Sequence, residues 1–405
     1  MENTAYLAFA IPAFFLFVWI EYKVAERKKM KNVFKYESSI SNISIGIAER
    51  LLNLFITGSF YQLFVYIYEN YRLMTLPNTW WIWIVMLLAT DFVWYWYHRL
   101  GHEINIFWGA HIVHHQSEEF NYTVAARITT LQAIVRNVFW CVLPFVGFHP
   151  NLVMTILVVH GVYSFFTHTQ VIGKLGWLEY ILITPSLHGV HHASDEKYLD
   201  KNYGDVFVFW DKIFGTFQEE EEKPHYGLTH PIKSYSFLWQ HFHYYLELYE
   251  AAKRENTIKG KLRIYFGSPA VMDQDIRPII EKKWLSKNKK DDYNFEFKNY
   301  LNIQLFVAFS LMLLMTYYYN RLDSLTLFVG TAFILITLIN IGAQLEQKRW
   351  VPYLEHIRFL IFSTYIIYES GYYYLIILPF LYVLIIERVF NFSKWYKKKV
   401  LKIFQ

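Results

Sequence analysis

Three tight clusters of histidine dominate the chemistry that this sequence can perform. They hold eight of the 16 histidines in the chain: His98 and His102, then His111, His114 and His115, then His188, His191 and His192. Imidazole is the most common protein ligand for iron, copper and zinc, and spacings of three and four residues place side chains on one face of a helix. A lone histidine is usually structural, but the repeated H-x-x-H-H pattern favours ligands. Eight imidazoles exceed the four ligands of a tetrahedral zinc ion, so the pattern predicts two metal ions.

The rest of the ligand inventory narrows the choice of metal. The chain has a single cysteine, Cys141, which excludes an intramolecular disulfide, a cysteine-based zinc site and an iron–sulfur cluster held by this chain alone. Nitrogen ligands with carboxylates nearby favour a non-haem iron pair. Ligand type alone leaves zinc, manganese and copper open.

The elements that must position these histidines are membrane helices. Hydrophobic residues make up 54% of the chain, aromatic residues 20% and charged residues 18%, which is unusual for a soluble domain. We therefore expect an all-α polytopic membrane protein with a cytoplasmic, histidine-rich di-metal domain. Nine apolar stretches approach the ~20 residues needed to cross a bilayer core: 5–22, 44–67, 80–97, 131–148, 151–172, 300–319, 323–343, 354–369 and 371–390.

Basic segments predict the orientation. "KVAERKKMKNVFK" after the first stretch and "KWYKKKVLK" near the end should lie in the cytoplasm, which puts the histidine clusters and residues 184–299, including a position near 290, on that side. The first stretch lacks a small-residue cleavage site and is expected to be a retained helix. The host membrane would be the bacterial cell membrane, or the endoplasmic reticulum in a eukaryote.

Polar residues within the apolar stretches are candidates for the site. His168, at the end of the fifth stretch, is predicted to be a ninth ligand. His160, two turns earlier, fits a ligand and a helix–helix hydrogen bond equally well. Asp91 lies seven residues before His98, and we expect it to accept an imidazole N–H, with an ion pair to Arg50 as the alternative.

Other segments are assigned by composition. "DKNYGDVFVFWDKIFGTF", directly after the third cluster, predicts a folded lid over the metals. The runs "EEEE" and "KKWLSKNKKDD" are interpreted as solvated faces, and the modest net charge argues against nucleic acid as a partner. The remaining histidines are expected to have no role at the metals: His149, His225, His230, His241, His243 and His356.

The order H-x-x-x-H, H-x-x-H-H, H-x-x-H-H resembles the fatty acid hydroxylase and sterol desaturase superfamily of integral-membrane di-iron oxygenases. The strings "HRLGHEINIFWGAHIVHHQSEEFNYTVAAR", "THTQVIGKLGWLE", "TPSLHGVHH" and "KNYGDVFVFWDKIFGTF" look like its alkylglycerol monooxygenase branch. The similarity is strong over about residues 80–232 and implies four parts. These are N-terminal transmembrane helices (1–79), a di-iron domain (80–232), a cytoplasmic polar segment (233–299), and C-terminal transmembrane helices with a basic tail (300–405).

The resemblance also implies a reaction and roles for residues. It implies that two iron ions and O2 hydroxylate the carbon next to the ether oxygen of a glyceryl ether lipid, with tetrahydrobiopterin or another electron donor. The eight clustered histidines would be ligands; where other branches carry a further histidine, this chain has Ser164. Within the matching strings, the catalytic candidates are Glu118, Asn121 and Asp211, and Glu103 and Arg127 are candidates for supporting the ligands.

Two alternatives remain at the level of sequence. A sterol desaturase or fatty acid hydroxylase acting on another lipid would carry the same histidine spacing. A metal-binding transporter would line a path across the bilayer with histidines, whereas these clusters gather at one face and no transporter-like repeat is evident. The alkylglycerol monooxygenase hypothesis and the enzyme alternative both imply a membrane lipid as substrate and the bilayer as surroundings.

Overall fold

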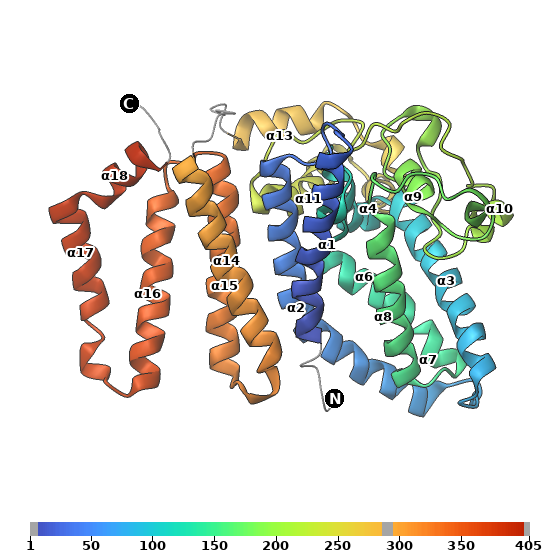
Figure 1. Cartoon of the computed structure of the whole chain (residues 1–405), viewed down its shortest axis with the longest axis horizontal. Helices are drawn as coiled ribbons and strands as arrows, with labels where there is room; N and C mark the ends of the chain where they lie inside the picture. The colour runs from blue at the N-terminus through green and yellow to red at the C-terminus, as the bar shows by residue number, and fades with distance from the viewer. Residues whose placement is uncertain (1–6, 286–294, 401–405) are drawn as a thin grey trace. The chain divides into compact units, whose positions relative to one another are not determined.

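A computed structural model describes residues 7–285 and 295–400 (Figure 1). Regular structure in these ranges is helical, apart from two isolated β-bridges, Leu182 with Phe207 and Ala193 with Tyr226. The chain forms two compact units. The larger contains Phe14–Lys233 and His241–Lys283. The smaller contains the described residues up to Ala13, Ser234–Gln240 and the described residues from Trp284 onward. Residue 290 and the rest of the basic run beyond residue 285 lie outside the described residues.

The first part of the chain alternates long apolar helices with short ones. The long helices are α1 (Leu7–Arg27), α2 (Tyr36–Tyr71), α3 (Trp80–Glu103), α6 (Thr130–Trp140) and α8 (Pro150–Thr167). The short elements are α4 (Asn105–His111), η1 (His114–Gln116), α5 (Tyr122–Ala125), α7 (Val142–Val146), η2 (Gly176–Tyr180), α9 (Pro185–His191), η3 (Glu196–Tyr198) and α10 (Phe209–Phe214). The segment predicted to be polar then folds into α11 (Phe237–Arg254), α12 (Ile258–Phe266), η4 (Pro269–Val271) and α13 (Ile276–Trp284).

An apolar core joins the helices α2, α3, α6 and α8 of the larger unit. Phe64 from α2, Met86 from α3, Trp140 from α6 and Val153 from α8 are all buried in one cluster. The chain reverses between α7 and α8 at Gly147, whose φ of +129° disfavours any side chain. A short turn therefore joins α7 to α8.

The expectation of one continuous span over 131–148 is wrong in detail. The segment forms α6, of 11 residues, and α7, of five, with a break at Cys141. Pro144 explains the break, because proline has no N–H to donate to the carbonyl of Trp140 four residues earlier. The two helices still follow one another in the same apolar segment.

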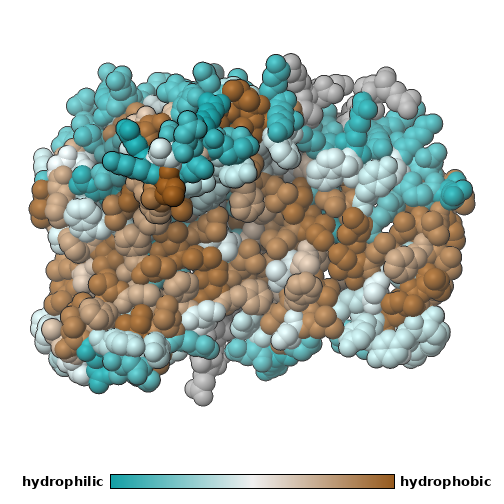
Figure 2. Space-filling view, turned by 180° about the vertical axis from the view of Figure 1, so that it is seen from behind, coloured by the Kyte–Doolittle hydropathy of each residue, from teal (hydrophilic) through white to brown (hydrophobic). Residues whose placement is uncertain are grey.

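Among the residues that the structure describes, five helices are long and apolar enough to cross a membrane: Tyr36–Tyr71, Pro150–Thr167, Phe297–Tyr317, Ser324–Leu345 and Tyr373–Phe390. Figure 2 shows hydrophobic residues gathered in the middle of the view and hydrophilic residues along its upper and lower edges. This distribution is typical of a protein whose helices cross a hydrocarbon layer. The chain is a multi-pass membrane protein.

The smaller unit consists of antiparallel helices: α14 (Phe295–Tyr317), η5 (Tyr319–Arg321), α15 (Ser324–Leu345), α16 (Val351–Ser370), η6 (Tyr373–Leu375), α17 (Leu378–Phe390) and α18 (Phe392–Lys399). A polar network holds these apolar helices together. The Glu355 carboxylate on α16 accepts hydrogen bonds from Tyr300 (2.6 Å) and Gln304 (2.7 Å) on α14 and from Asn340 (2.8 Å) on α15. Such bonds between helices replace hydration inside a membrane.

Candidate metal centre

The histidine clusters lie on four elements that end or begin at one place in the larger unit. His98 and His102 occupy the last turns of α3, and the chain turns directly into α4, which ends at His111. Both H-x-x-H-H triplets lie at the end of a short helix, the second one on α9. Short helices with abrupt ends let neighbouring histidines point in different directions.

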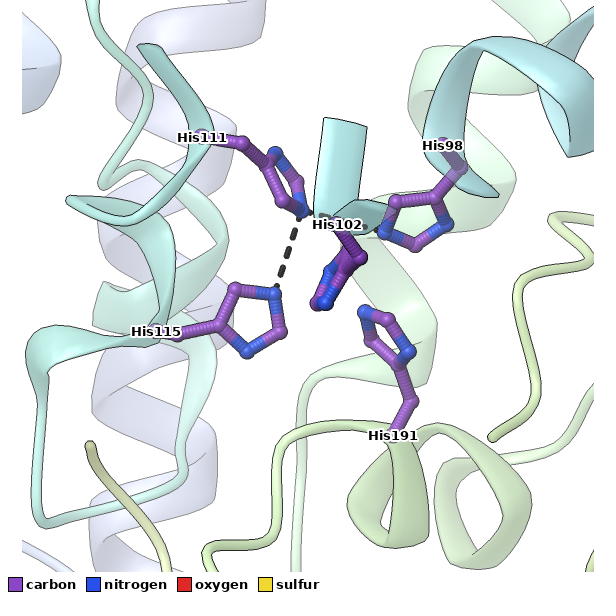
Figure 3. Close-up of side chains that lie close together, drawn as sticks. All are labelled: His98, His102, His111, His115 and His191. Atoms are coloured by element: carbon purple, nitrogen blue, oxygen red, sulfur yellow. Dashed lines mark hydrogen bonds between the residues drawn. The ribbon is translucent and has the colours of Figure 1, made fainter. Parts of the chain in front are cut away.

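The histidines form two groups rather than one. Within each group, one ring nitrogen of every member lies within 4.8 Å of those of the others. The first group is drawn in Figure 3, where the rings converge on a common centre; it contains His98, His102, His111, His115 and His191. The second contains His114, His168, His188 and His192.

The ends of the short helices explain this division. On one continuous helix all three histidines of H-x-x-H-H would share a face. Because α4 ends at His111 and α9 ends at His191, the middle histidine of each triplet can point away from the other two. Accordingly His111 and His115 join the first group and His114 joins the second. The other triplet works in reverse, since His188 and His192 join the second group and His191 the first. Each triplet thus serves both groups.

Backbone carbonyls orient four of the rings. The Nδ1 atom lies within hydrogen-bond distance of Tyr203 O for His98 (2.8 Å) and of Lys201 O for His191 (2.9 Å). For His114 and His168 the acceptors are Arg127 O (3.3 Å) and Ser164 O (2.7 Å). A carbonyl only accepts, so each Nδ1 carries the proton and each Nε2 carries a lone pair.

These lone pairs require a cation. The Nε2 atoms of His114 and His168 are 3.1 Å apart, yet both are acceptors and cannot hydrogen-bond to each other. Burial lowers the pKa values of His114, His188 and His192 well below their usual range, with neighbouring imidazoles adding to the effect, so protonation does not supply the cation. Neutral imidazoles with Nδ1–H bound to a carbonyl are the form that ligates metals, and the nitrogen donor set suits iron, zinc or copper.

The first group supports the same conclusion. Within residues 7–285 and 295–400, the buried Nε2 atoms of His102 and His191 have no hydrogen-bond partner. His111 Nε2 lies 3.1 Å from Nε2 of both His98 and His115. Buried polar atoms without partners are rare unless an ion or water satisfies them.

The other histidines lie apart from both groups. His160 approaches Asp205 with its Nδ1 at 2.7 Å and falls in a separate buried group with Asp91 and Asp205. His149 caps α8, where its Nδ1 accepts the amide of Asn151. Neither contributes to the two histidine groups.

The structure corrects the expectation for Asp91. Its carboxylate accepts the amides of Val206 (2.9 Å) and Phe207 (3.0 Å) and the indole N–H of Trp210 (3.1 Å), rather than an N–H from a histidine of the two groups. The alternative partner, Arg50, instead forms an ion pair with Glu49. Sequence spacing identified a buried carboxylate that needs donors, but the donors come from a segment more than 100 residues away.

Three other predicted site residues are either exposed or make local structural contacts. Glu103 is exposed and pairs with Arg99 at 2.8 Å. Glu118 is exposed, and Asn121 caps α5 while its side chain donates to the carbonyl of Val33. Their positions in the matching strings did not reveal which way the side chains point.

Arg127 and Asp211 support backbone segments whose carbonyls face the histidines. The guanidinium of Arg127 donates to Val113 O (2.6 Å) and Asn42 (2.8 Å), which fixes the backbone whose carbonyl faces His114. Asp211, a predicted catalyst, instead accepts the amides of Tyr203 (2.7 Å) and Gly204 (2.8 Å). Burial raises the pKa of Asp211.

Sequence reasoning missed two residues at the site. The ring of Tyr203 contacts the first group, with centroid distances of 5.3 Å to His102 and 5.8 Å to His98. Glu21 on α1 accepts the amide of Tyr122 at 2.7 Å and a hydrogen bond from Thr169, next to His168. Tyr203 falls in the predicted lid, which supports that interpretation; an acidic residue inside an apolar helix was the available signal for Glu21.

Comparison with known proteins agrees with this geometry. Residues 83–216 match the fatty acid hydroxylase family, which spans all nine histidines. The chain therefore combines two histidine groups, helices that can cross a membrane and a match to this family. Together these features define a membrane lipid hydroxylase, an oxygen-dependent oxidoreductase. No solved structure matches the chain significantly.

Relatives that align over most of the chain refine the assignment. Human alkylglycerol monooxygenase is 34% identical over 370 residues, covering 89% of this chain and 82% of the human protein. The zebrafish (Danio rerio) alkylglycerol monooxygenase is 30% identical, covering 88% and 81%. An ornithine lipid hydroxylase from Rhizobium tropici is 28% identical over 33% of this chain and 41% of its own length. The chain belongs to the alkylglycerol monooxygenase family.

Proposed function

We propose that this protein uses two iron ions and O2 to cleave the ether bond of glyceryl ether lipids. The observation that carries the proposal is the convergence of nine histidines, eight of them buried and His102 half-buried, in two groups, within a chain that aligns almost throughout with alkylglycerol monooxygenases. Monooxygenation inserts one oxygen atom into the C–H bond next to the ether oxygen, and two electrons and two protons reduce the other atom to water. The resulting hemiacetal collapses to an aldehyde and a glycerol hydroxyl.

The bound iron pair would supply the activation of O2 that this reaction needs. The ligands would be His98, His102, His111, His115 and His191 for one ion and His114, His168, His188 and His192 for the other. Carbonyl partners hold four of these rings, those of His98, His191, His114 and His168, in the ligating tautomer.

The chain's aromatic residues provide the apolar surroundings. Phe120 is buried with its ring 5.1 Å from that of His192 and 5.7 Å from that of His168. The ring centroid of Trp108 lies 4.8 Å from that of His102, in the first histidine group. These rings exclude water from the reacting centre, which protects a C–H oxidation from side reactions.

The proposal extends to topology and surroundings. We place nine spans in the membrane by adding α1, α3, α16 and the α6–α7 segment to the five helices above, with the metal centre on the cytoplasmic face. The basic segments after α1 and in α18 support that orientation. The membrane would be the bacterial cell membrane or the endoplasmic reticulum.

Tetrahydrobiopterin is the proposed electron donor, with another reductant as the alternative. The reaction requires two electrons from outside the chain, so a donor is needed. Membership of the alkylglycerol monooxygenase family is the support for tetrahydrobiopterin in that role. Hydroxylation of a different lipid is the second candidate function, favoured by the partial similarity to an ornithine lipid hydroxylase. Metal transport lacks support, since the histidines converge in two groups instead of lining a path.

The test is turnover of a defined ether lipid. The full chain in nanodiscs, loaded with Fe²⁺ and supplied with O2 and tetrahydrobiopterin, is incubated with 1-O-hexadecylglycerol, and hexadecanal is quantified. Release of the aldehyde, absent without O2 and absent with the His188→Ala variant, is expected. Hydroxylation of ornithine lipid without aldehyde release from the ether would overturn ether cleavage in favour of the second candidate.

A further inference from the structure

One segment of the larger unit is built around the first histidine group without containing a histidine. Residues Asp200–Phe207, named the strap here, follow α9 and precede α10. Two carbonyls of the strap, those of Lys201 and Tyr203, accept the Nδ1–H groups of His191 and His98. The carbonyl acceptors of the second group, at Ser164 and Arg127, lie elsewhere in the chain.

Asn202 lies between these two carbonyls in an unusual conformation. Its φ is +55°, in the left-handed region that asparagine tolerates better than most residues. Its buried side chain donates to Leu187 O (3.0 Å) on α9 and to Gln218 O (2.7 Å), and accepts the amide of Gln218 (2.9 Å). The same residue therefore sets the backbone geometry of the strap and ties it to the helix that carries His191.

Two carboxylates hold the part of the strap that follows Asn202. Asp211 accepts the amides of Tyr203 and Gly204, and the Cβ of any residue larger than glycine at 204 would lie 2.9 Å from its Oδ2 and 2.7 Å from Phe207 O. Asp91 accepts the amides of Val206 and Phe207. Since Asp91 and His98 are both on α3, the ligand and its acceptor are fixed to one helix.

We propose that Asn202 is a positioning residue for the iron of the first histidine group and leaves the iron of the second group unaffected. The proposal rests on the proposed di-iron function. Through the carbonyls of Lys201 and Tyr203, Asn202 fixes the orientation of two of the five rings at once. The pair of iron sites is thus unequal, with one of them dependent on a segment outside the histidine motifs.

The experiment measures iron release rather than turnover. The full chain in nanodiscs is loaded with Fe²⁺ without O2, and transfer of iron to the chelator ferrozine is followed over time. Asn202→Gly keeps the left-handed backbone accessible but removes the side chain. We expect release of one iron to accelerate by about 10-fold or more, the usual cost of losing an outer partner, while the other is released at the wild-type rate. Asn137→Ala, which removes an amide bonded to a carbonyl within α6, is the matched control.

Two backgrounds identify the iron that is affected. His168→Ala should retain only the first group's iron, and adding Asn202→Gly should speed its release; His98→Ala should retain only the second group's iron, which Asn202→Gly should leave unchanged. Gly204→Ala, which displaces only the strap around Tyr203, is a second variant and should speed release of the same iron.

The outcomes separate the two proposals. Equal acceleration of both irons, or wild-type release in both Asn202→Gly and Gly204→Ala, overturns the role of Asn202 while the di-iron function stands. Wild-type protein that holds no iron overturns the di-iron function, and the role of Asn202 with it.

Discussion

The Nε2 atoms of His114 and His168 lie 3.1 Å apart, although the Nδ1 atom of each ring faces a backbone carbonyl of its own. Two acceptors at this distance repel unless a cation lies between them or beside both. His188 Nε2 approaches His168 Nε2 at 3.0 Å and completes the same arrangement. The geometry of the second group is therefore that of a metal site, fixed by residues 54 positions apart in the chain.

Replacing His114 tests this arrangement directly. His114→Ala should leave one iron per chain and lower ether lipid turnover by more than the ~10–100-fold typical of losing an outer partner, because it opens the coordination of one ion. Iron is measured by elemental analysis and turnover by aldehyde release. Full activity with two bound irons would refute the second group as a metal site.

Removal of the metals should weaken the fold. The buried lone pairs of nine imidazoles face one another without compensation when the ions are absent, so chelation should lower the melting temperature of the protein in nanodiscs. Differential scanning fluorimetry before and after chelation, followed by Fe²⁺ addition, provides the measurement. A melting temperature that does not change with iron content would contradict the prediction.

The carboxylate of Asp91 should matter for stability through the hydrogen bonds that it accepts. Asp91→Asn places N–H groups against the donors Phe207 and Trp210, and we expect the free energy of unfolding to fall by about 1–3 kcal/mol, the cost of buried groups left unsatisfied. Denaturant unfolding measures the change. The control is Thr90→Val on the neighbouring residue, whose buried hydroxyl has no hydrogen-bond partner among the described residues. An equal effect of both variants would show that packing, rather than the hydrogen bonds, is responsible.

The sequence allowed the histidine set and the helical membrane fold to be predicted, because both depend on local periodicity. The number of imidazoles predicted two metal ions, but which histidine joins which group could not be predicted, because it depends on where the short helices end. The partners of Asp91 and Asp211 could not be predicted, since they are backbone amides of the strap brought close only by tertiary folding. For the same reason Glu118 could not be recognised as exposed from its place beside the second cluster.

The orientation in the membrane predicts opposite accessibility at two positions. In a Cys141→Ser background, a cysteine replacing exposed Lys261 on α12 should react with an impermeant thiol reagent only after the cells are opened. A cysteine replacing His149, in the turn before α8, should react from outside. Reaction of the position at 261 in intact cells would reverse the proposed topology.

His160 on α8 and His168, the residue that directly follows α8, should behave differently although they lie only eight residues apart. His168→Ala removes a ring from the second group and should leave one iron per chain. His160→Ala removes the partner of buried Asp205, and breaking such a pair costs about 3–5 kcal/mol because one charge remains buried alone. We therefore expect His160→Ala to be isolated with two irons but to unfold at lower denaturant concentration. Iron content and unfolding midpoint are measured on the same samples; loss of an iron from His160→Ala at unchanged stability would make His160 a ligand and contradict the division of the site proposed here.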